Sequence, residues 1–193
     1  MGKYIVGITG ASGSIYGVRL IEELTKADNE IFLVITDNGR KVLEYEVDIV
    51  FQKWFENINK NKTKLKLCAI DDMFSCIASG SFKTDGMIIV PCSMGTLSKI
   101  SSGSSDNLLI RAADVMIKEK RKLILIPRET PLSSIHLKNM LFLSDLNVSI
   151  IPPMPAFYQK PKTIEDIINT TVGRILGSLN VDSDLCHEWS GNE

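Results

Sequence analysis

Residues 3–17 read Lys3-Tyr-Ile-Val-Gly-Ile-Thr9 and then Gly10-Ala-Ser-Gly-Ser-Ile-Tyr-Gly17, and this stretch decides the fold. The first part is apolar without a polar face, which is typical of a strand buried inside a parallel sheet. The glycines then allow a tight turn. Over residues 14–26 apolar side chains recur every three or four positions, which predicts a helix with one buried face. Strand, glycine-rich turn and helix together indicate the start of an α/β fold.

The rest of the chain continues this alternation of apolar strands and amphipathic helices. Further strands are expected at residues 30–36, 64–70, 86–91, 122–127 and 148–151. Further helices are expected around residues 39–45, 106–120, 134–146 and 163–179. Apolar strands separated by helices predict three layers, with a mostly parallel sheet covered by helices on both faces. Alternating lysines in residues 57–66 are typical of a solvated sheet edge.

Composition excludes several classes of function. The 193 residues include 22 Lys or Arg and 23 Asp or Glu, so the net charge of −1 argues against a general nucleic-acid binder. No apolar run approaches the roughly 20 residues of a membrane span, and no signal segment opens the chain. The four cysteines lack metal or CxxC spacing. We therefore expect a single cytoplasmic domain over residues 1–193, with reduced thiols, no metal and no membrane partner.

The unusual residues follow the expected strands. They are Gly10–Gly13, Thr36, residues 91–96 and residues 127–129. Because ligands of open parallel sheets bind at the carboxyl ends of the strands, these residues predict the binding site. The glycine-rich turn favours an anion such as phosphate, although no GK[ST] follows it and it is not a P-loop.

A nicotinamide cofactor is the first alternative. The glycine spacing also resembles the turn of NAD(P)-dependent short-chain dehydrogenases, and Asp37 could bind a ribose. Tyr158 and Lys162 have the spacing of the catalytic pair in those enzymes. Pro161 lies between them and further prolines precede them, so the helix which that mechanism needs is not expected. The nicotinamide interpretation therefore takes second place.

Four long motifs resemble the UbiX-type flavin prenyltransferases and occur in the same order. They are GITGASGSIYG (7–17), ASGSFKTDGMIIVPCSMGTLSKI (78–100), SSDNLLIRAADVMIKEKRKLILIPRETPLSSIHLKNM (104–140) and PPMPAFYQKP (152–161). The resemblance implies a flavodoxin-like or Rossmann-like fold and a homo-oligomer, typically a dodecamer. It implies that dimethylallyl monophosphate alkylates N5 and C6 of reduced FMN without a metal. The product, prenylated FMN, would serve a UbiD-type decarboxylase.

The same resemblance assigns roles around the flavin. The residues expected to contact FMN are Gly10, Ala11, Ser12, Gly13, Thr36, Ser93, Met94, Gly95, Thr96, Arg111 and Arg128. The first four would hold the phosphate end or line the flavin. Ser12 and Glu46 would form a catalytic pair, because a hydroxyl beside a carboxylate can relay the proton that N5 loses on alkylation. Without the resemblance, Glu46 would read as a surface glutamate after a helix.

A second group would hold the donor phosphate. Lys118, Arg128, Tyr158 and Arg174 match the family residues with this role, since cations and a phenol stabilise a departing phosphate. Glu129 would assist proton transfer. A C-terminal tail, about residues 180–193, would place Trp189 over the site of a neighbouring subunit. The residues named so far could also have purely structural roles.

The structural alternative differs for each residue. Arg111, Asp114 and Lys118 lie three and four residues apart, as in an ordinary helix salt-bridge ladder. Arg174 could belong to the polar face of the last helix. Trp189 could be a packing anchor. Met73 and Phe74 could wall the prenyl chain, but family members carry Trp nearby.

Two other activities fit the same fold. One is a non-catalytic FMN-binding protein. The other is a flavoprotein decarboxylase of the cysteine-decarboxylase type, which needs a catalytic histidine before the middle strands and a Pro-x-Met-Asn segment. Here His136 falls in an expected helix, and residues 152–158 read PPMPAFY. We therefore expect His136 to be structural and Cys92 to be a small buried residue rather than a nucleophile.

Overall fold

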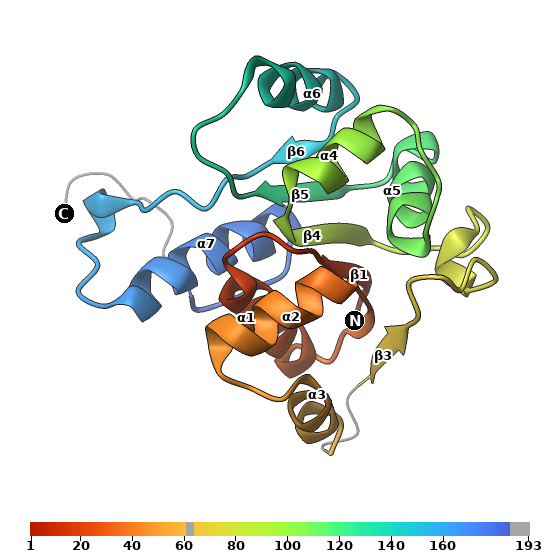
Figure 1. The fold of residues 1–193 in the computed structure, drawn as a ribbon. Helices are drawn as coiled ribbons and strands as arrows, with labels where there is room; N and C mark the ends of the chain where they lie inside the picture. Colours follow the sequence, from red (N-terminus) through yellow and green to blue (C-terminus); the bar gives the residue numbers. More distant parts are fainter. Residues whose placement is uncertain (61–63, 186–193) are drawn as a thin grey trace.

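The computed structural model describes residues 1–60 and 64–185 and contains one parallel sheet (Figure 1). The strands are β1 (Lys3–Ile8), β2 (Glu30–Ile35), β3 (Lys64–Cys68), β4 (Gly86–Cys92), β5 (Leu123–Pro127) and β6 (Ser149–Ile150). They are arranged in the order β3-β2-β1-β4-β5-β6. All of the pairings are parallel. The chain starts in the centre and reverses direction across the sheet between β1 and β4, as in a Rossmann-like fold.

Helices cover both faces of the sheet, which confirms the three-layer prediction. They are α1 (Ser14–Lys26), α2 (Asp37–Val47), α3 (Phe51–Asn59), α4 (Met94–Ser101), α5 (Leu108–Lys118), α6 (Ser134–Asp145) and α7 (Ile164–Ser178). Two short 3-10 turns, η1 (Cys76–Ala78) and η2 (Phe157–Gln159), lie in the long connections. Figure 1 shows α4, α5 and α6 on one side of the sheet and α1, α2 and α7 on the other.

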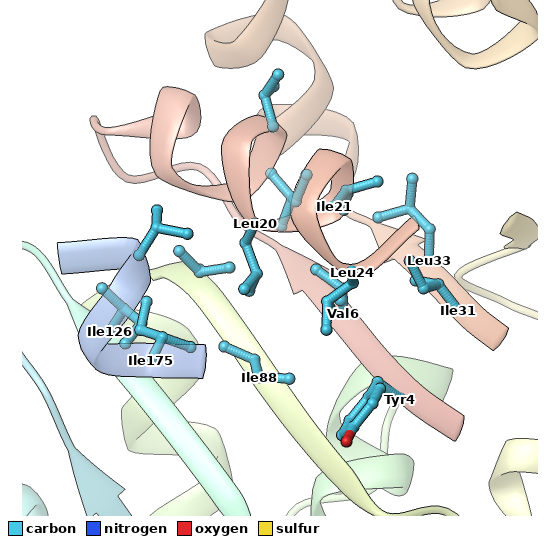
Figure 2. Close-up of a cluster of buried hydrophobic side chains, with 14 of the residues drawn as sticks. Tyr4, Val6, Leu20, Ile21, Leu24, Ile31, Leu33, Ile88, Ile126 and Ile175 are labelled. Atoms are coloured by element: carbon cyan, nitrogen blue, oxygen red, sulfur yellow. The ribbon is translucent and has the colours of Figure 1, made fainter. Parts of the chain in front are cut away.

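Two apolar clusters hold these layers together, one on each face. Alternate residues of β1 point to opposite faces, so Val6 packs with α1 and α7, whereas Ile5 packs with α4 and α5. Figure 2 shows the first cluster, in which Leu20 of α1 and Ile175 of α7 meet the central strands. Because both faces of the sheet are buried, the strands read as continuous apolar runs in the sequence.

Close packing explains one glycine of the turn. Gly17 lies on the face of α1 that touches β4, and a Cβ there would come within 2.6 Å of the Val90 carbonyl oxygen. Any larger residue would push α1 away from the sheet. Gly17 therefore brings the start of α1 close to the end of β4.

The expected elements are present, with ends that shift by a few residues. The helix expected at residues 14–26 is α1, with the same bounds. The structure adds α3 and α4, which were not predicted. The lysine-rich edge is confirmed: β3 is an outer strand, and Lys64 and Lys66 pair with Asp28 and Glu30.

Two further observations concern the described residues. None of their helices is both long and apolar enough to cross a membrane. Within residues 1–60 and 64–185, no group of three or more His, Cys, Asp or Glu side chains could hold a metal ion.

Candidate active site at the carboxyl edge of the sheet

The predicted flavin residues meet where the strand order reverses. β1 and β4 are neighbours, so the turn at Gly10–Gly13 lies beside the turn at residues 93–96. Thr36 follows β2 on one side, and Arg128 follows β5 on the other. This is the position at which doubly wound α/β sheets bind their ligands. Residues far apart in the chain are thus brought together as predicted.

The glycine-rich turn is closed by a carboxylate from another helix. Gly13 has a φ of 104°, a conformation that favours glycine, and it begins α1 without a side-chain cap. Instead, Oε2 of Glu46, on α2, accepts hydrogen bonds from the backbone N–H of Gly13 at 2.9 Å and of Ser14 at 3.0 Å. The amides at the start of α1 are therefore already occupied by an anion of the chain itself.

This contact bears on which of two expected roles Gly13 has. Gly13 was expected to hold the phosphate end of FMN or to line the flavin. A phosphate at the start of α1 would compete with Glu46 for the same N–H groups and would face a like charge. The geometry therefore disfavours the phosphate role for Gly13 and leaves the turn free to line the flavin ring.

Glu46 is also bound to Ser12, as the resemblance implied. Partial burial raises the pKa of this carboxyl, but hydrogen bonds from the Ser12 hydroxyl and from the Gly13 and Ser14 amides outweigh burial and hold the pKa below its ordinary value. Glu46 is consequently ionised at neutral pH. Because the Ser12 hydroxyl donates to Glu46, its oxygen can accept a hydrogen bond from a neighbouring N–H group.

Thr36 helps to fix the helix that carries Glu46. Its backbone N–H donates to the Ile8 carbonyl at 3.0 Å, which continues the β1–β2 ladder. Its hydroxyl accepts a hydrogen bond from the Gly39 amide at 3.0 Å and so caps α2. α2 carries Glu46 at its other end, so the cap helps to fix the helix that delivers the carboxylate.

The second turn presents hydroxyls at the start of α4. Ser93 caps α4: its Oγ accepts from the Thr96 amide at 3.3 Å and lies 3.0 Å from Thr96 Oγ1. The backbone of Ser93 is fixed in turn by Thr9, whose buried hydroxyl accepts from the Ser93 amide at 2.8 Å. Gly95 is exposed, and no atom lies within 4 Å of where its Cβ would be. The turn is therefore rigid but open on its outer side.

Arg128 connects the third loop to the first turn. Its backbone N–H donates to the Cys92 carbonyl at 3.3 Å, and its Nε donates to the Ser12 carbonyl at 3.3 Å. The side chain is exposed, so the guanidinium has further donors for an anion. Glu129 is also exposed, and its carboxylate accepts from the Thr130 amide at 3.0 Å. Both charges therefore stand at the carboxyl edge, as predicted.

Tyr158 and Arg174 line a separate part of the surface. They contribute to a cavity of about 890 Å³ between the segment after β6, α7 and residues 181–183. That volume lies within the range of small-molecule sites. Gln159 tethers the loop that carries Tyr158 to α7, because its Oε1 accepts from the Thr170 hydroxyl at 2.8 Å. The prediction that Tyr158 and Arg174 act together agrees with this placement.

The single chain does not bring Lys118 and Arg111 to this site. Lys118 ends α5 beside Gly80, at the amino edge of the sheet, and its Nζ contacts Glu119 at 2.9 Å. Arg111 donates to the Ala78 carbonyl at 3.1 Å and to Asp114 at 2.8 Å. For Lys118 the physical reason is the connectivity: α5 leads into β5, so its last turn must lie at the edge where β5 begins. The expected roles of Lys118 at the donor phosphate and of Arg111 at FMN stay predictions.

The remaining candidates divide into three groups. His136 closes a capping box at the start of α6, where its Nδ1 accepts from the Ser133 amide, so it is structural as expected. Cys92 is fully buried, and burial raises the pKa of its thiol, which makes it a poor nucleophile. Phe74 is exposed on the connection before η1, and its contact with the prenyl chain stays a prediction. Trp189 lies outside the described residues.

Thr9 was missed from the sequence. A threonine at the end of a buried strand reads as an ordinary β-branched strand residue, although its position directly before Gly10 is a usable signal. The contacts of the Thr9 side chain with the end of β4 depend on β1 and β4 being neighbours in the sheet, and the sequence alone does not reveal the order of the strands.

Comparison with known proteins agrees with the geometry. A family model described as Flavoprotein matches residues 2–176. The flavin prenyltransferase UbiX of Methanocaldococcus jannaschii is 50% identical over 97% of this chain and 98% of its own length. The crystal structure of AnUbiX in complex with FMN and dimethylallyl pyrophosphate superposes with a TM-score of 0.91 at 41% identity, covering 100% of this chain and 99% of that one.

A second solved structure bears on assembly. A dodecameric FMN-dependent UbiX-like decarboxylase from Escherichia coli superposes with a TM-score of 0.90 at 42% identity. The match covers 98% of this chain and 100% of that chain. Both solved structures therefore share the whole fold with this chain, including the carboxyl edge where the turns meet.

Proposed function

The chain belongs to the UbiX family of flavin prenyltransferases, and we propose that it joins a dimethylallyl group from dimethylallyl monophosphate to N5 and C6 of reduced FMN. The observation that carries this proposal is the hydrogen-bonded pair of Ser12 and Glu46 at the turn between β1 and α1. A serine whose hydroxyl donates to an ionised carboxylate can accept a proton, which alkylation of a flavin nitrogen requires.

Bound reduced FMN would supply N5 and C6 as nucleophiles, the C1–O bond of the donor would break, and inorganic phosphate would leave. Ser12 would accept the proton lost from N5 and pass its own proton to Glu46. Ring closure would join C6 to C3 of the prenyl group as its C2=C3 double bond opens and C2 takes up a proton, and Glu129 would assist the transfer of the proton that C6 loses. The small residues Gly10, Ala11 and Gly13 would let the ring approach the backbone, because they carry little or no side chain.

The FMN phosphate would lie at the second turn. Met94 and Gly95 offer backbone N–H groups at the start of α4, and Ser93 and Thr96 offer two hydroxyls, whereas the amides of Ser93 and Thr96 already donate to Thr9 and Ser93. No carboxylate of the described chain bonds to that turn, unlike the start of α1, so an anion meets no like charge there. This placement assigns the two turns different parts of the cofactor.

The family resemblance implies that Arg128, Tyr158 and Arg174 would hold the donor phosphate; of these, Tyr158 and Arg174 line one cavity, whereas Arg128 lies beside the first turn. Arginine can bind two phosphate oxygens at once, and a phenol adds one directional donor. Both groups stabilise the negative charge that grows on the leaving phosphate. AnUbiX was solved with dimethylallyl pyrophosphate, so the preference for the monophosphate must be tested on this chain.

Lys118 and Arg111 would act on the site of a neighbouring copy in a homo-oligomer. Their own chain holds them away from Ser12, and one similar structure is dodecameric. α6 and its C-cap also expose large apolar side chains, namely Ile135, Leu137, Leu141, Phe142 and Leu146. An apolar surface of this kind is typical of an interface between subunits. The proposal therefore includes a dodecamer, in which Trp189 would act on the site of a neighbouring subunit.

Three further assignments belong to the same proposal. The whole chain would act as one domain, it would work in the cytoplasm, and its product would be delivered to a UbiD-type decarboxylase. The match to UbiX relatives over nearly the full length of both chains supports the single domain, and the other two assignments rest on the family resemblance.

The proposal is tested by phosphate release. Purified protein is incubated without oxygen with dimethylallyl monophosphate and reduced FMN, and inorganic phosphate is measured over time. We expect release with reduced FMN and none with oxidised FMN, because the oxidised ring is electron-poor and its N5 is a weak nucleophile. A non-catalytic FMN-binding protein would bind the flavin and release no phosphate. A parallel reaction with dimethylallyl pyrophosphate, in which added pyrophosphatase converts released pyrophosphate into inorganic phosphate, decides which donor is used.

A further inference from the structure

Thr9 lies between the two turns of the candidate site. It follows β1 directly, precedes Gly10, and is only 1% exposed. Its hydroxyl donates to the Pro91 carbonyl at 2.8 Å and accepts from the Ser93 amide at 2.8 Å. Both partners belong to the segment that leaves β4, so one buried hydroxyl spans the gap between two strand ends.

The two hydrogen bonds fix the start of each turn. Ser93 has an extended backbone and is the residue at which the chain changes direction from β4 into α4. Its own hydroxyl caps α4 through the Thr96 amide. The backbone amide of Thr9 also donates to the Pro91 carbonyl, at 3.3 Å. The hydrogen bonds therefore run from the end of β1, through Thr9, to the first turn of α4.

We propose that Thr9 is a positioning residue for FMN, because its hydroxyl sets the spacing between the glycine-rich turn and the turn at residues 93–96. This inference rests on the proposed function, in which the first turn lines the flavin ring and the second holds its phosphate. A ligand that spans two loops binds more tightly when the loops are already fixed at the right distance. Thr9 does not touch the ligand in this account.

Removal of the hydroxyl would leave the Ser93 amide without its partner and the Pro91 carbonyl with only the weaker bond from the Thr9 amide. The Ser93 amide and the Pro91 carbonyl would then gain from moving toward water or toward other partners. The second turn would shift or become mobile, and FMN would bind less tightly. A purely structural role would instead lower stability and leave the affinity for FMN unchanged.

Thr84 offers a matched control. It is also buried, 9% exposed, and its hydroxyl contacts Met116 Sδ at 3.4 Å. It lies just before β4, at the opposite edge of the sheet from the site. A Thr84→Val substitution therefore removes a buried threonine hydroxyl from the same fold without touching either turn.

The experiment measures the dissociation constant for FMN by flavin fluorescence and, separately, resistance to urea. We expect Thr9→Val to raise the constant by roughly tenfold or more, equivalent to the loss of one well-made hydrogen bond. Thr9→Ser, which keeps the hydroxyl, should stay within about threefold of the wild type, and Thr84→Val should match the wild type. Unchanged affinity in Thr9→Val, or equal loss in Thr9→Val and Thr84→Val, would overturn the inference.

A second measurement uses the wild type, so it does not depend on whether Thr9→Val folds. Amide hydrogen exchange of the peptide around Ser93 is followed without FMN. Slow exchange is expected, because the amide is bonded to a buried hydroxyl. If the Ser93 amide exchanges fast without FMN and slowly only with FMN, the distance between the two turns is not fixed before FMN binds, and the inference is contradicted. A wild type that binds no FMN at all would overturn the proposed function together with this inference.

Discussion

Glu46 Oε2 accepts a hydrogen bond from the Gly13 amide at 2.9 Å, although the two residues lie 33 positions apart. The contact joins α2 to the turn that precedes α1 and gives the first turn of α1 the anion that its free amides favour. The same carboxylate binds the Ser12 hydroxyl. Glu46 therefore both stabilises the turn before α1 and binds the Ser12 hydroxyl. Substitution of Glu46 or of Ser12 can test each of these roles.

Stability should depend on pH through Glu46. Its pKa is lower in the folded chain than the ordinary value of 4.5, so its contribution to stability is complete above that value and is lost as the pH falls through the folded pKa. We expect Glu46→Gln to unfold more easily than the wild type near pH 7, by about 1 kcal/mol or less because the side chain is exposed. The difference should shrink near pH 4. Urea unfolding at both pH values measures it.

The control for this prediction is Glu56→Gln, an exposed glutamate of α3 outside the site. It should differ little from the wild type at either pH. A deficit for Glu46→Gln that stays the same at both pH values would show that the charge of Glu46 is not what stabilises the turn.

Catalysis should be more sensitive than binding to the loss of Ser12. Ser12→Ala removes the hydroxyl that would accept the N5 proton but leaves the backbone of the turn in place. We expect turnover to fall by about a hundredfold or more, the usual contribution of a positioned acid–base group. The affinity for FMN, measured by fluorescence, should change by less than about threefold. Parallel loss of turnover and of FMN affinity would instead assign Ser12 to flavin binding.

The cavity at Tyr158 should determine how the donor binds. Arg174→Lys keeps a positive charge but loses the two-point contact with phosphate, so we expect KM for dimethylallyl monophosphate to rise roughly tenfold. Tyr158→Phe should have a smaller effect in the same direction. Lys160→Ala, a cation of the same loop outside the cavity lining, serves as the control. A KM that stays constant in Arg174→Lys would exclude this cavity as the phosphate site.

Lys118 should act on a neighbouring subunit. Lys118→Ala removes only an exposed contact with Glu119, so stability should change little while turnover falls strongly. Arg174→Ala should also be nearly inactive. If the two side chains serve one site from different chains, oligomers reassembled from a mixture of both variants should regain part of the activity. Mixed oligomers as inactive as either parent would contradict the shared site.

Assembly should depend on the apolar side of α6. Leu141→Asp places a charge among exposed apolar side chains and should reduce the size of the oligomer seen by analytical ultracentrifugation. Lys138→Asp, on the same helix, changes charge at a polar position and is the control. An oligomer of unchanged size in Leu141→Asp would remove α6 from the interface.

Much of the fold could be predicted because both faces of the sheet are buried. The apolar strands and α1 stand out as continuous or periodic runs. α3 was overlooked, although Phe51, Trp54, Phe55 and Ile58 have helical spacing, because lysine-rich residues surround it. α4 was hidden in a Ser/Gly-rich stretch, where few side chains show a period.

The site was predictable in part. The order of the strands was not known, yet every strand of a parallel sheet ends at the same edge, so Gly10, Ser93 and Arg128 could be grouped. A helix that leads into β5 must end at the other edge, so the order of the elements places Lys118 away from Ser12 in its own chain, whereas a role at a neighbouring site cannot be read from that order. Contacts such as Glu46 with Gly13 depend on how helices pack, and no local pattern encodes that.

The most direct test of the central claim is the mass of the flavin after reaction. The protein is incubated without oxygen with reduced FMN and dimethylallyl monophosphate, and the flavin is then released and analysed by mass spectrometry. The account predicts a flavin heavier than FMN by one prenyl unit, formed by the wild type and nearly absent with Ser12→Ala. A flavin recovered from the wild type with the unchanged mass of FMN would contradict it.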